Sequence, residues 1–115
     1  MDRMRQVNEE IHRIVAEIVA RDVELPLDTF VTVTHVQTSK DLRHSSIFLT
    51  VLPDAKRVST IKVIERASRH IQRIFGQKIS LKFTPKLQFH FDEGEIRAQK
   101  IYDALDQTDP LRDPS

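Results

Sequence analysis

Two kinds of hydrophobic spacing alternate along this chain. From about Asp2 to Arg21, apolar residues recur every three or four positions, the spacing of a helix that buries one face; they are Met4, Val7, Ile11, Ile14, Val15 and Ile18. From Phe30 to Thr38, and again from about Arg43 to Leu52, β-branched and other apolar residues dominate, as they do in strands. The polar turn Ser39-Lys40-Asp41 separates these two runs. We therefore expect a helix followed by a β-hairpin.

The second strand run is apolar on both of its alternating sides. Its apolar residues are Ile47, Phe48, Leu49, Val51 and Leu52. A strand that is covered on both faces and paired on both edges has this composition, so we expect it at the centre of the sheet. Pro53 closes the run, and Asp54 is placed to cap the helix that follows.

The segment from Ala55 to Phe75 returns to helical spacing. Its expected buried side consists of Val58, Ile61, Ile64, Ala67 or Ser68, Ile71, Ile74 and Phe75. The apolar side thins at Ala67-Ser68, where small residues favour a bend, so the segment is expected to form two helices. Gly76 is expected to end the second helix in the left-handed conformation.

A third alternating run extends from Lys78 to Phe91. Its apolar positions are Ile79, Leu81, Phe83, Leu87, Phe89 and Phe91, and Lys78, Lys82 and Lys86 occupy the other side. Pro85 predicts an edge strand, because proline donates no backbone hydrogen bond. A helical crossover joins parallel strands, so this strand and the central one are expected to be parallel.

These elements predict an α+β fold of order α-β-β-α-α-β, with a three-stranded mixed sheet packed against helices. A weaker helix is expected from Glu95 to Leu105. We expect one domain over residues 1–105 and a disordered acidic tail over residues 106–115.

The net charge of +1 conceals a strong segregation of charge. Residues 55–91 hold nine lysines and arginines and one acid, Glu65, whereas the rest of the chain holds nine bases and sixteen acids. A single domain that sorts its charge in this way is expected to present a basic surface to a polyanion. The alternative is that these charges are the solvated faces of ordinary amphipathic elements.

Four of these cations share one side of the expected helical segment. Lys62, Arg66, Arg69 and Arg73 are spaced four, three and four residues apart. With Arg57 and the three strand lysines, they are suited to following a phosphate backbone. The strand phenylalanines fall on the expected buried side, so recognition is expected to depend on backbone and shape more than on base edges.

Catalytic chemistry finds little support in the composition. The chain has no cysteine, and its two glycines are too few for a phosphate-binding or dinucleotide-binding loop. The five histidines show no metal-ligand spacing, and no strained elbow surrounds Ser45-Ser46 beside His44. We expect a non-enzyme without cofactor or metal. A small hydrolase that uses Asp92, Glu93 and Glu95 is kept as a third hypothesis.

No apolar run approaches the roughly 18 residues of a membrane span, and no signal-peptide core precedes the first helix. We therefore expect a cytoplasmic protein without a membrane partner.

Three stretches resemble the ribosome-binding factor A family, and the element order is that of a type II KH domain. The stretches are Arg3-Met4-Arg5-Gln6-Val7 followed by Ile11; Val31-Thr32-Val33-Thr34 followed by Ser39-Lys40-Asp41-Leu42; and Pro85-Lys86-Leu87-Gln88-Phe89-His90-Phe91-Asp92. Their order and spacing together are specific, and they cover most of the chain from Arg3 to Leu105.

The resemblance implies a monomeric assembly factor without a small-molecule substrate. Such a factor binds immature small (30S) ribosomal subunits and 16S rRNA, and supports pre-rRNA processing and cold adaptation. It also implies that an Ala-x-Gly kink replaces the GXXG loop of KH domains. Here Ala67-Ser68-Arg69 occupies the kink, with arginine in place of glycine, so a shallower kink is expected if Arg69 is helical.

The candidate RNA-binding residues are therefore Arg57, Lys62, Arg66, Ala67, Ser68, Arg69, Arg73, Lys78, Lys82 and Lys86. A protein-interaction module, whose basic face meets an acidic partner without direct RNA contact, is the second hypothesis.

Overall fold

The computed structural model describes residues 2–92 and gives the expected order of elements. These elements are α1 (Arg3–Asp22), β1 (Phe30–Thr38), β2 (His44–Leu52), the short 3-10 turn η1 (Asp54–Lys56), α2 (Arg57–Arg66), α3 (Ser68–Lys78) and β3 (Lys86–Phe91). The predicted order α-β-β-α-α-β is confirmed. The helix expected from Glu95 to Leu105 and the tail expected over 106–115 lie outside the described residues.

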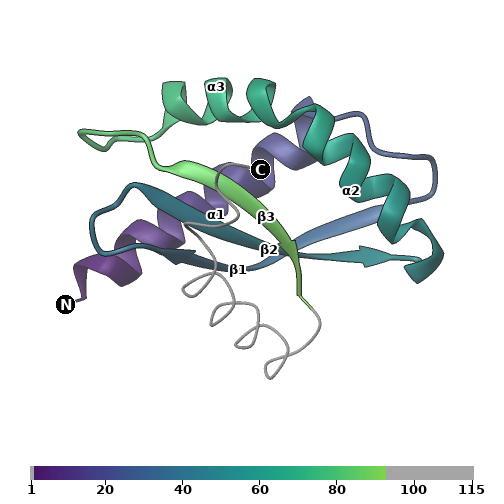
Figure 1. The fold of residues 1–115 in the computed structure, drawn as a ribbon, viewed down its shortest axis with the longest axis horizontal. Helices are drawn as coiled ribbons and strands as arrows, with labels where there is room; N and C mark the ends of the chain where they lie inside the picture. The colour runs from purple at the N-terminus through teal and green to yellow at the C-terminus, as the bar shows by residue number, and fades with distance from the viewer. Residues whose placement is uncertain (1, 93–115) are drawn as a thin grey trace, which may run out of the picture.

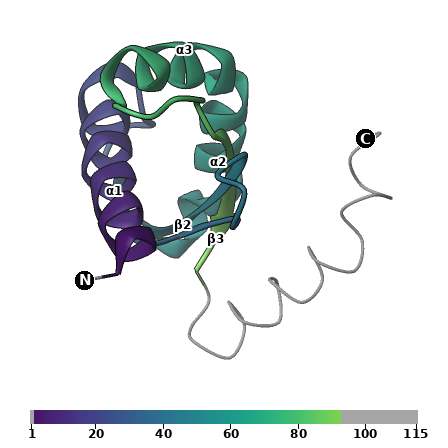
Figure 2. The ribbon, with the colours of Figure 1, turned by 90° about the vertical axis from the view of Figure 1, so that its left-hand side faces the viewer.

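The three strands form one mixed sheet of order β1-β2-β3. β1 and β2 are antiparallel, with Phe30 opposite Leu52, and β2 and β3 are parallel, with His44 opposite Lys86. The prediction that β2 is the central strand is confirmed. The helices gather on one side of the sheet, where α1 packs against β1 and α3 (Figures 1 and 2). Within the described part of the chain, every helix is too short or too polar to cross a membrane.

One apolar core lies between the sheet and the helices. α1 contributes six buried residues, which are Val7, Ile11, Ile14, Val15, Ile18 and Val19. The crossover adds Ile64, Ile71 and Phe75, all with no exposed surface. The inner face of the sheet supplies Val33, Val36, Ile47, Leu49 and Leu87. The helical spacing seen in the sequence therefore identifies the buried side of α1 and of α3, but only part of the buried side of α2.

Two predicted helix boundaries are wrong. Asp54 lies inside η1 and caps neither η1 nor α2, because the 3-10 turn begins directly after Pro53. Gly76 does not end α3, which continues to Lys78 and closes at Ile79 with φ −84°. Lys78 and the two residues before it are exposed, so the last turn needs no apolar side chain to continue.

The third strand is shorter than the alternating pattern predicts. β3 begins at Lys86, opposite the first residue of β2, so the chain before Lys86 lies beyond the end of its pairing partner. Phe83, expected in the core, lies in the loop before β3 and is 67% exposed. Val58, expected on the buried side of α2, is 63% exposed, whereas Thr60 of the same helix is fully buried.

Candidate nucleic-acid interface

Seven exposed cations follow the crossover and the start of β3; we call them the basic band. They are Lys62, Arg66, Arg69, Arg73, Lys78, Lys82 and Lys86. Within residues 2–92, the ion pairs that reach 4.0 Å or closer are Arg5–Glu9, Arg13–Glu17, Arg43–Asp41 and Arg57–Asp54, and none of them includes a member of the band. Among residues 2–92, the charges of the band therefore have no carboxylate partner, and the Arg73 guanidinium hydrogen-bonds to His70 Nδ1 at 2.9 Å.

A break at Ala67 divides the helical part of the band between two helices. Ala67 has φ −87° and ψ 2°, at the edge of the helical region. Helical hydrogen bonds continue on both sides, since the Ala67 N–H donates to the Val63 carbonyl at 3.0 Å and the Ile71 N–H donates to the Ala67 carbonyl at 2.8 Å. The direction of the chain changes here without an intervening loop (Figure 1).

Two arginines flank the break, with Ala67 and Ser68 between them. Arg66 ends α2, and Arg69 lies in the first turn of α3. Ser68 and Arg69 are both exposed, and the first turn of α3 contains no acidic residue and no side-chain cap. Because the N-terminus of a helix is already positive, two cations beside it favour an anion at this position.

The alternating pattern predicted that the three lysines share one face of a strand. The structure shows that they do not. Lys78 is the last residue of α3, Lys82 lies in the loop, and Lys86 is the first residue of β3. Leu87 packs into the core on the helical side of the sheet, so alternation turns Lys86 to the opposite side. The basic band therefore runs along the helices and then around the end of the sheet.

Arg57 differs from the basic band in that its guanidinium contacts an aromatic ring and a carboxylate. Its guanidinium lies 4.3 Å from the centre of the Phe91 ring and 3.7 Å from the Asp54 carboxylate. The side chain is 30% exposed. These contacts give Arg57 a structural role in joining the start of α2 to the end of β3.

The turn between β1 and β2 adds two cations that the sequence analysis missed. Lys40 and Arg43 are exposed, and the carbonyl of Arg43 accepts a hydrogen bond from the Lys86 N–H at 2.8 Å. Their sequence signal is weak, because they lie in a turn and only the parallel pairing of β3 brings Arg43 beside Lys86.

The turn also perturbs one carboxylate. Hydrogen bonds from the Ser39 hydroxyl at 2.6 Å and the Arg43 N–H at 3.1 Å lower the pKa of Asp41 below its ordinary value of 3.8.

The side chains considered for catalysis have other contacts. Ser45 shares a buried hydrogen bond of 2.9 Å with the Thr38 hydroxyl, which also donates to Asn8 Oδ1 at 2.6 Å. Asp92 accepts a hydrogen bond from Thr34, and Glu93 and Glu95 lie outside the described residues. Over residues 2–92, no three histidine or acidic side chains are grouped as a metal site would need.

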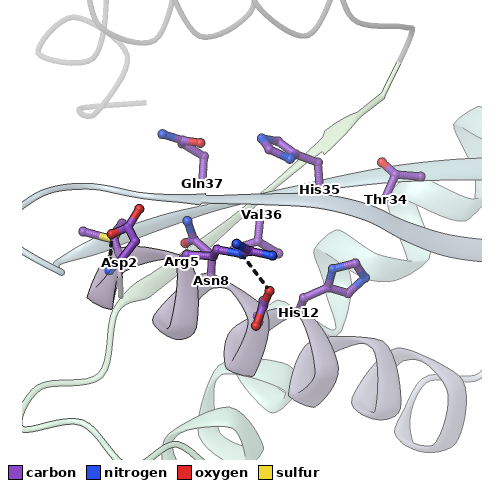
Figure 3. A pocket seen from close by; sticks show the side chains of 10 residues that line it. Asp2, Arg5, Asn8, His12, Thr34, His35, Val36 and Gln37 are labelled. Atoms are coloured by element: carbon purple, nitrogen blue, oxygen red, sulfur yellow. Dashed lines mark hydrogen bonds and ion pairs between the residues drawn. The ribbon is translucent and has the colours of Figure 1, made fainter.

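One hollow lies at the outer edge of β1 and does not belong to the basic band. It has a volume of about 440 Å³ and is lined by α1 and by Thr34 to Gln37. Figure 3 shows His35 and Gln37 on the side of β1 away from α1, while the Arg5–Glu9 ion pair lies on the helix. The hollow therefore curls around a strand edge, and its polar side chains come from both sides of that edge.

Comparison with known proteins agrees with this fold. The family model of ribosome-binding factor A matches residues 3–105. Ribosome-binding factor A of Halothermothrix orenii is 31% identical over 104 residues, which are 90% of this chain and 85% of the relative.

One crystal structure and one fitted homology model share the fold. The crystal structure of ribosome-binding factor A from Thermus thermophilus aligns with a TM-score of 0.68 at 20% identity, covering 80% of this chain and 98% of that one. A homology model of the Thermus thermophilus factor, fitted into the electron cryo-microscopy map of its 30S complex, aligns with a TM-score of 0.56 at 23% identity. That alignment covers 71% of this chain and 87% of the other. The family match spans both the core and the basic band, and the chain belongs to the ribosome-binding factor A family.

Proposed function

We propose that this chain is a non-catalytic assembly factor of the cytoplasm that binds immature small ribosomal subunits as a monomer through 16S rRNA. Its proposed role is to support pre-rRNA processing and subunit maturation, including growth in the cold. The observation that carries the proposal is the basic band, in which seven exposed cations lack a carboxylate partner among residues 2–92. Family membership supports it, as does the 30S complex of the Thermus thermophilus relative.

The position of the band favours contact with the phosphate backbone. Arginine side chains form paired hydrogen bonds with phosphate oxygens, and Arg66, Arg69 and Arg73 lie on both sides of the break. The described aromatic side chains near the band are few: Phe83 is exposed, with the Lys82 Nζ 5.7 Å from the centre of its ring. RNA shape and phosphate spacing are therefore the features that this surface is built to read.

The test is neutralisation of the band with a matched control. The variant replaces Arg66, Arg69 and Arg73 with glutamine; the control replaces Arg3, Arg13 and Arg21 of α1, which are also exposed. Sedimentation with immature small subunits is measured over a series of salt concentrations. Only the first variant should lose affinity, and its log–log salt slope should fall by about 2–3, since each lost phosphate contact removes roughly 0.7–0.9. Equal losses in both variants would show that net charge alone matters.

A second arm separates RNA binding from binding to an acidic protein. Naked 16S rRNA should bind the wild-type chain and lose affinity for the band variant. Failure of naked rRNA to bind, while subunits still bind, would favour the protein-interaction module.

A third arm tests the biological role. The chain is expressed in a bacterial strain that lacks its own family member, with growth and precursor 16S rRNA measured at low temperature. The wild-type chain should restore both.

A further inference from the structure

Three large apolar side chains are exposed at the end of the sheet where β1 begins and β2 ends. Leu27 is 83% exposed, Phe30 is 70% exposed and Leu52 is 63% exposed. Phe30 and Leu52 are direct partners in the antiparallel pair, so their side chains adjoin. Single exposed apolar residues are ordinary, but neighbouring ones form a patch that marks an interaction surface.

The Phe30 and Leu52 side chains of this patch face away from the helical core. Val51 is buried and Val31 packs against the core, so strand alternation turns Phe30 and Leu52 to the opposite face of the sheet. Leu27 lies in the turn that leads into β1, and the Thr29 hydroxyl donates to its carbonyl at 3.2 Å.

The charge around the patch is opposite to that of the basic band. Residues 22–30 contain three acids, Asp22, Glu24 and Asp28, and no base. All three are exposed, and none forms an ion pair with a side chain of residues 2–92. We call these acids, together with Leu27, Phe30 and Leu52, the acidic-apolar end. In Figure 1 the loop after α1 and the end of β2 lie at the right, whereas the loop before β3 lies at the left.

We infer that the acidic-apolar end docks a basic protein segment that carries a large apolar side chain. Acidic residues repel RNA phosphates, so this end is unsuited to the ligand of the basic band. An apolar side chain of the partner would cover Phe30 and Leu52, while lysines or arginines would pair with the surrounding carboxylates. The inference rests on the proposed function and extends it. In addition to the RNA contact of its basic band, the chain would contact a basic protein segment of the small subunit.

The test uses a photo-crosslinker at two matched positions of the full chain. One variant carries p-benzoylphenylalanine in place of Phe30, and the control carries it in place of Phe83, which is 67% exposed beside Lys82. Both are irradiated with immature small subunits, and separately with the proteins extracted from those subunits free of RNA. Crosslinked peptides and nucleotides are identified by mass spectrometry. A third variant with the crosslinker at Leu27 repeats the measurement without altering a strand.

We expect position 30 to crosslink to lysine- and arginine-rich protein segments in both samples, and position 83 to crosslink to RNA in the subunits. Crosslinking of position 30 to RNA, to a second copy of this chain, or to nothing in both samples would overturn the inference. Failure of the wild-type chain to sediment with subunits would instead overturn the proposed function, and the RNA-free sample would still decide this inference.

Discussion

The side-chain amide of Gln72 hydrogen-bonds to the backbone of both Leu87 and Pro85, so that α3 is joined to the open edge of β3. The Leu87 N–H donates to Gln72 Oε1 at 3.0 Å, and Gln72 Nε2 donates to the carbonyl of Pro85 at 2.8 Å. The intervening Lys86 N–H donates toward β2, to the carbonyl of Arg43. The Gln72 amide therefore satisfies backbone groups that an additional strand would otherwise bind.

Replacing Gln72 with alanine should destabilise the protein by about 1–3 kcal/mol, because it leaves a strand N–H and a carbonyl without their partner. Urea unfolding measures the change. The control is Gln77→Ala on the same helix, where the side chain is exposed. Equal unfolding midpoints for the two variants would contradict the role given to Gln72.

Thr38 holds a buried polar connection between α1, β1 and β2. Thr38→Val should lower the free energy of unfolding by about 1–3 kcal/mol, since Asn8 and Ser45 both lose their hydrogen bond to the hydroxyl. The same replacement at the exposed Thr32 of β1 is the control and should be nearly neutral. A neutral Thr38 variant in thermal unfolding would show that these bonds add nothing to stability.

Gly76→Ala should stabilise the protein by about 0.5–1 kcal/mol. Gly76 is helical and exposed, and an added Cβ would lie 3.5 Å from the Thr84 hydroxyl oxygen, an ordinary contact. Alanine restricts the unfolded chain more than glycine does, and here it meets no steric conflict. A lower melting temperature of the alanine variant would contradict the helical position of this residue.

Two replacements of Arg69 distinguish the effect of its charge from the effect of its backbone conformation. Arg69→Ala and Arg69→Gly both remove the cation, and each should reduce the salt slope of RNA binding by about 0.7–0.9. Only the glycine variant should also lose stability, by up to about 1 kcal/mol, because Arg69 is helical. If the glycine variant is as stable as the alanine variant, the backbone at position 69 tolerates the residue that the family kink carries.

Acid titration should show Asp41 ionised to a lower pH than a free aspartate. Hydrogen bonds from Ser39 and Arg43 lower its folded pKa below 3.8, so its contribution to stability is present above that value and is lost as the pH falls through the lowered pKa. NMR titration of the carboxyl carbon measures this pKa. The Ser39→Ala variant should bring it back toward 3.8; an unchanged value would exclude Ser39 as the main cause.

Local periodicity predicts those elements whose form depends on their own side chains. β1 has the predicted bounds, and the break in the crossover lies at Ala67, where the apolar side thins. The alternation from Lys78 to Phe91 misleads because a strand also needs a partner, and β2 begins only opposite Lys86. The start of β3 is therefore set by the start of β2, and the local sequence pattern of β3 does not contain this information.

The candidate site was predictable in composition and not in shape. The sequence shows which residues of the crossover are cations. The direction in which each cation points depends on packing. Lys86 turns away from the helices because Leu87 enters the core, and Arg57 is held by Phe91 and Asp54. Lys40 and Arg43 lie in the turn between β1 and β2, which is beside the start of β3 and has no periodic spacing.

The break at Ala67 also leads to an expectation about the heat capacity of polyanion binding. Ile64 and Ile71, both fully buried, fix the helices on either side, and no loop lies between them. We therefore expect a polyanion that binds across the break to restrict side-chain rotamers and to leave the backbone unchanged. Its binding enthalpy should change little with temperature, without the large negative heat-capacity change of a segment that folds on its ligand.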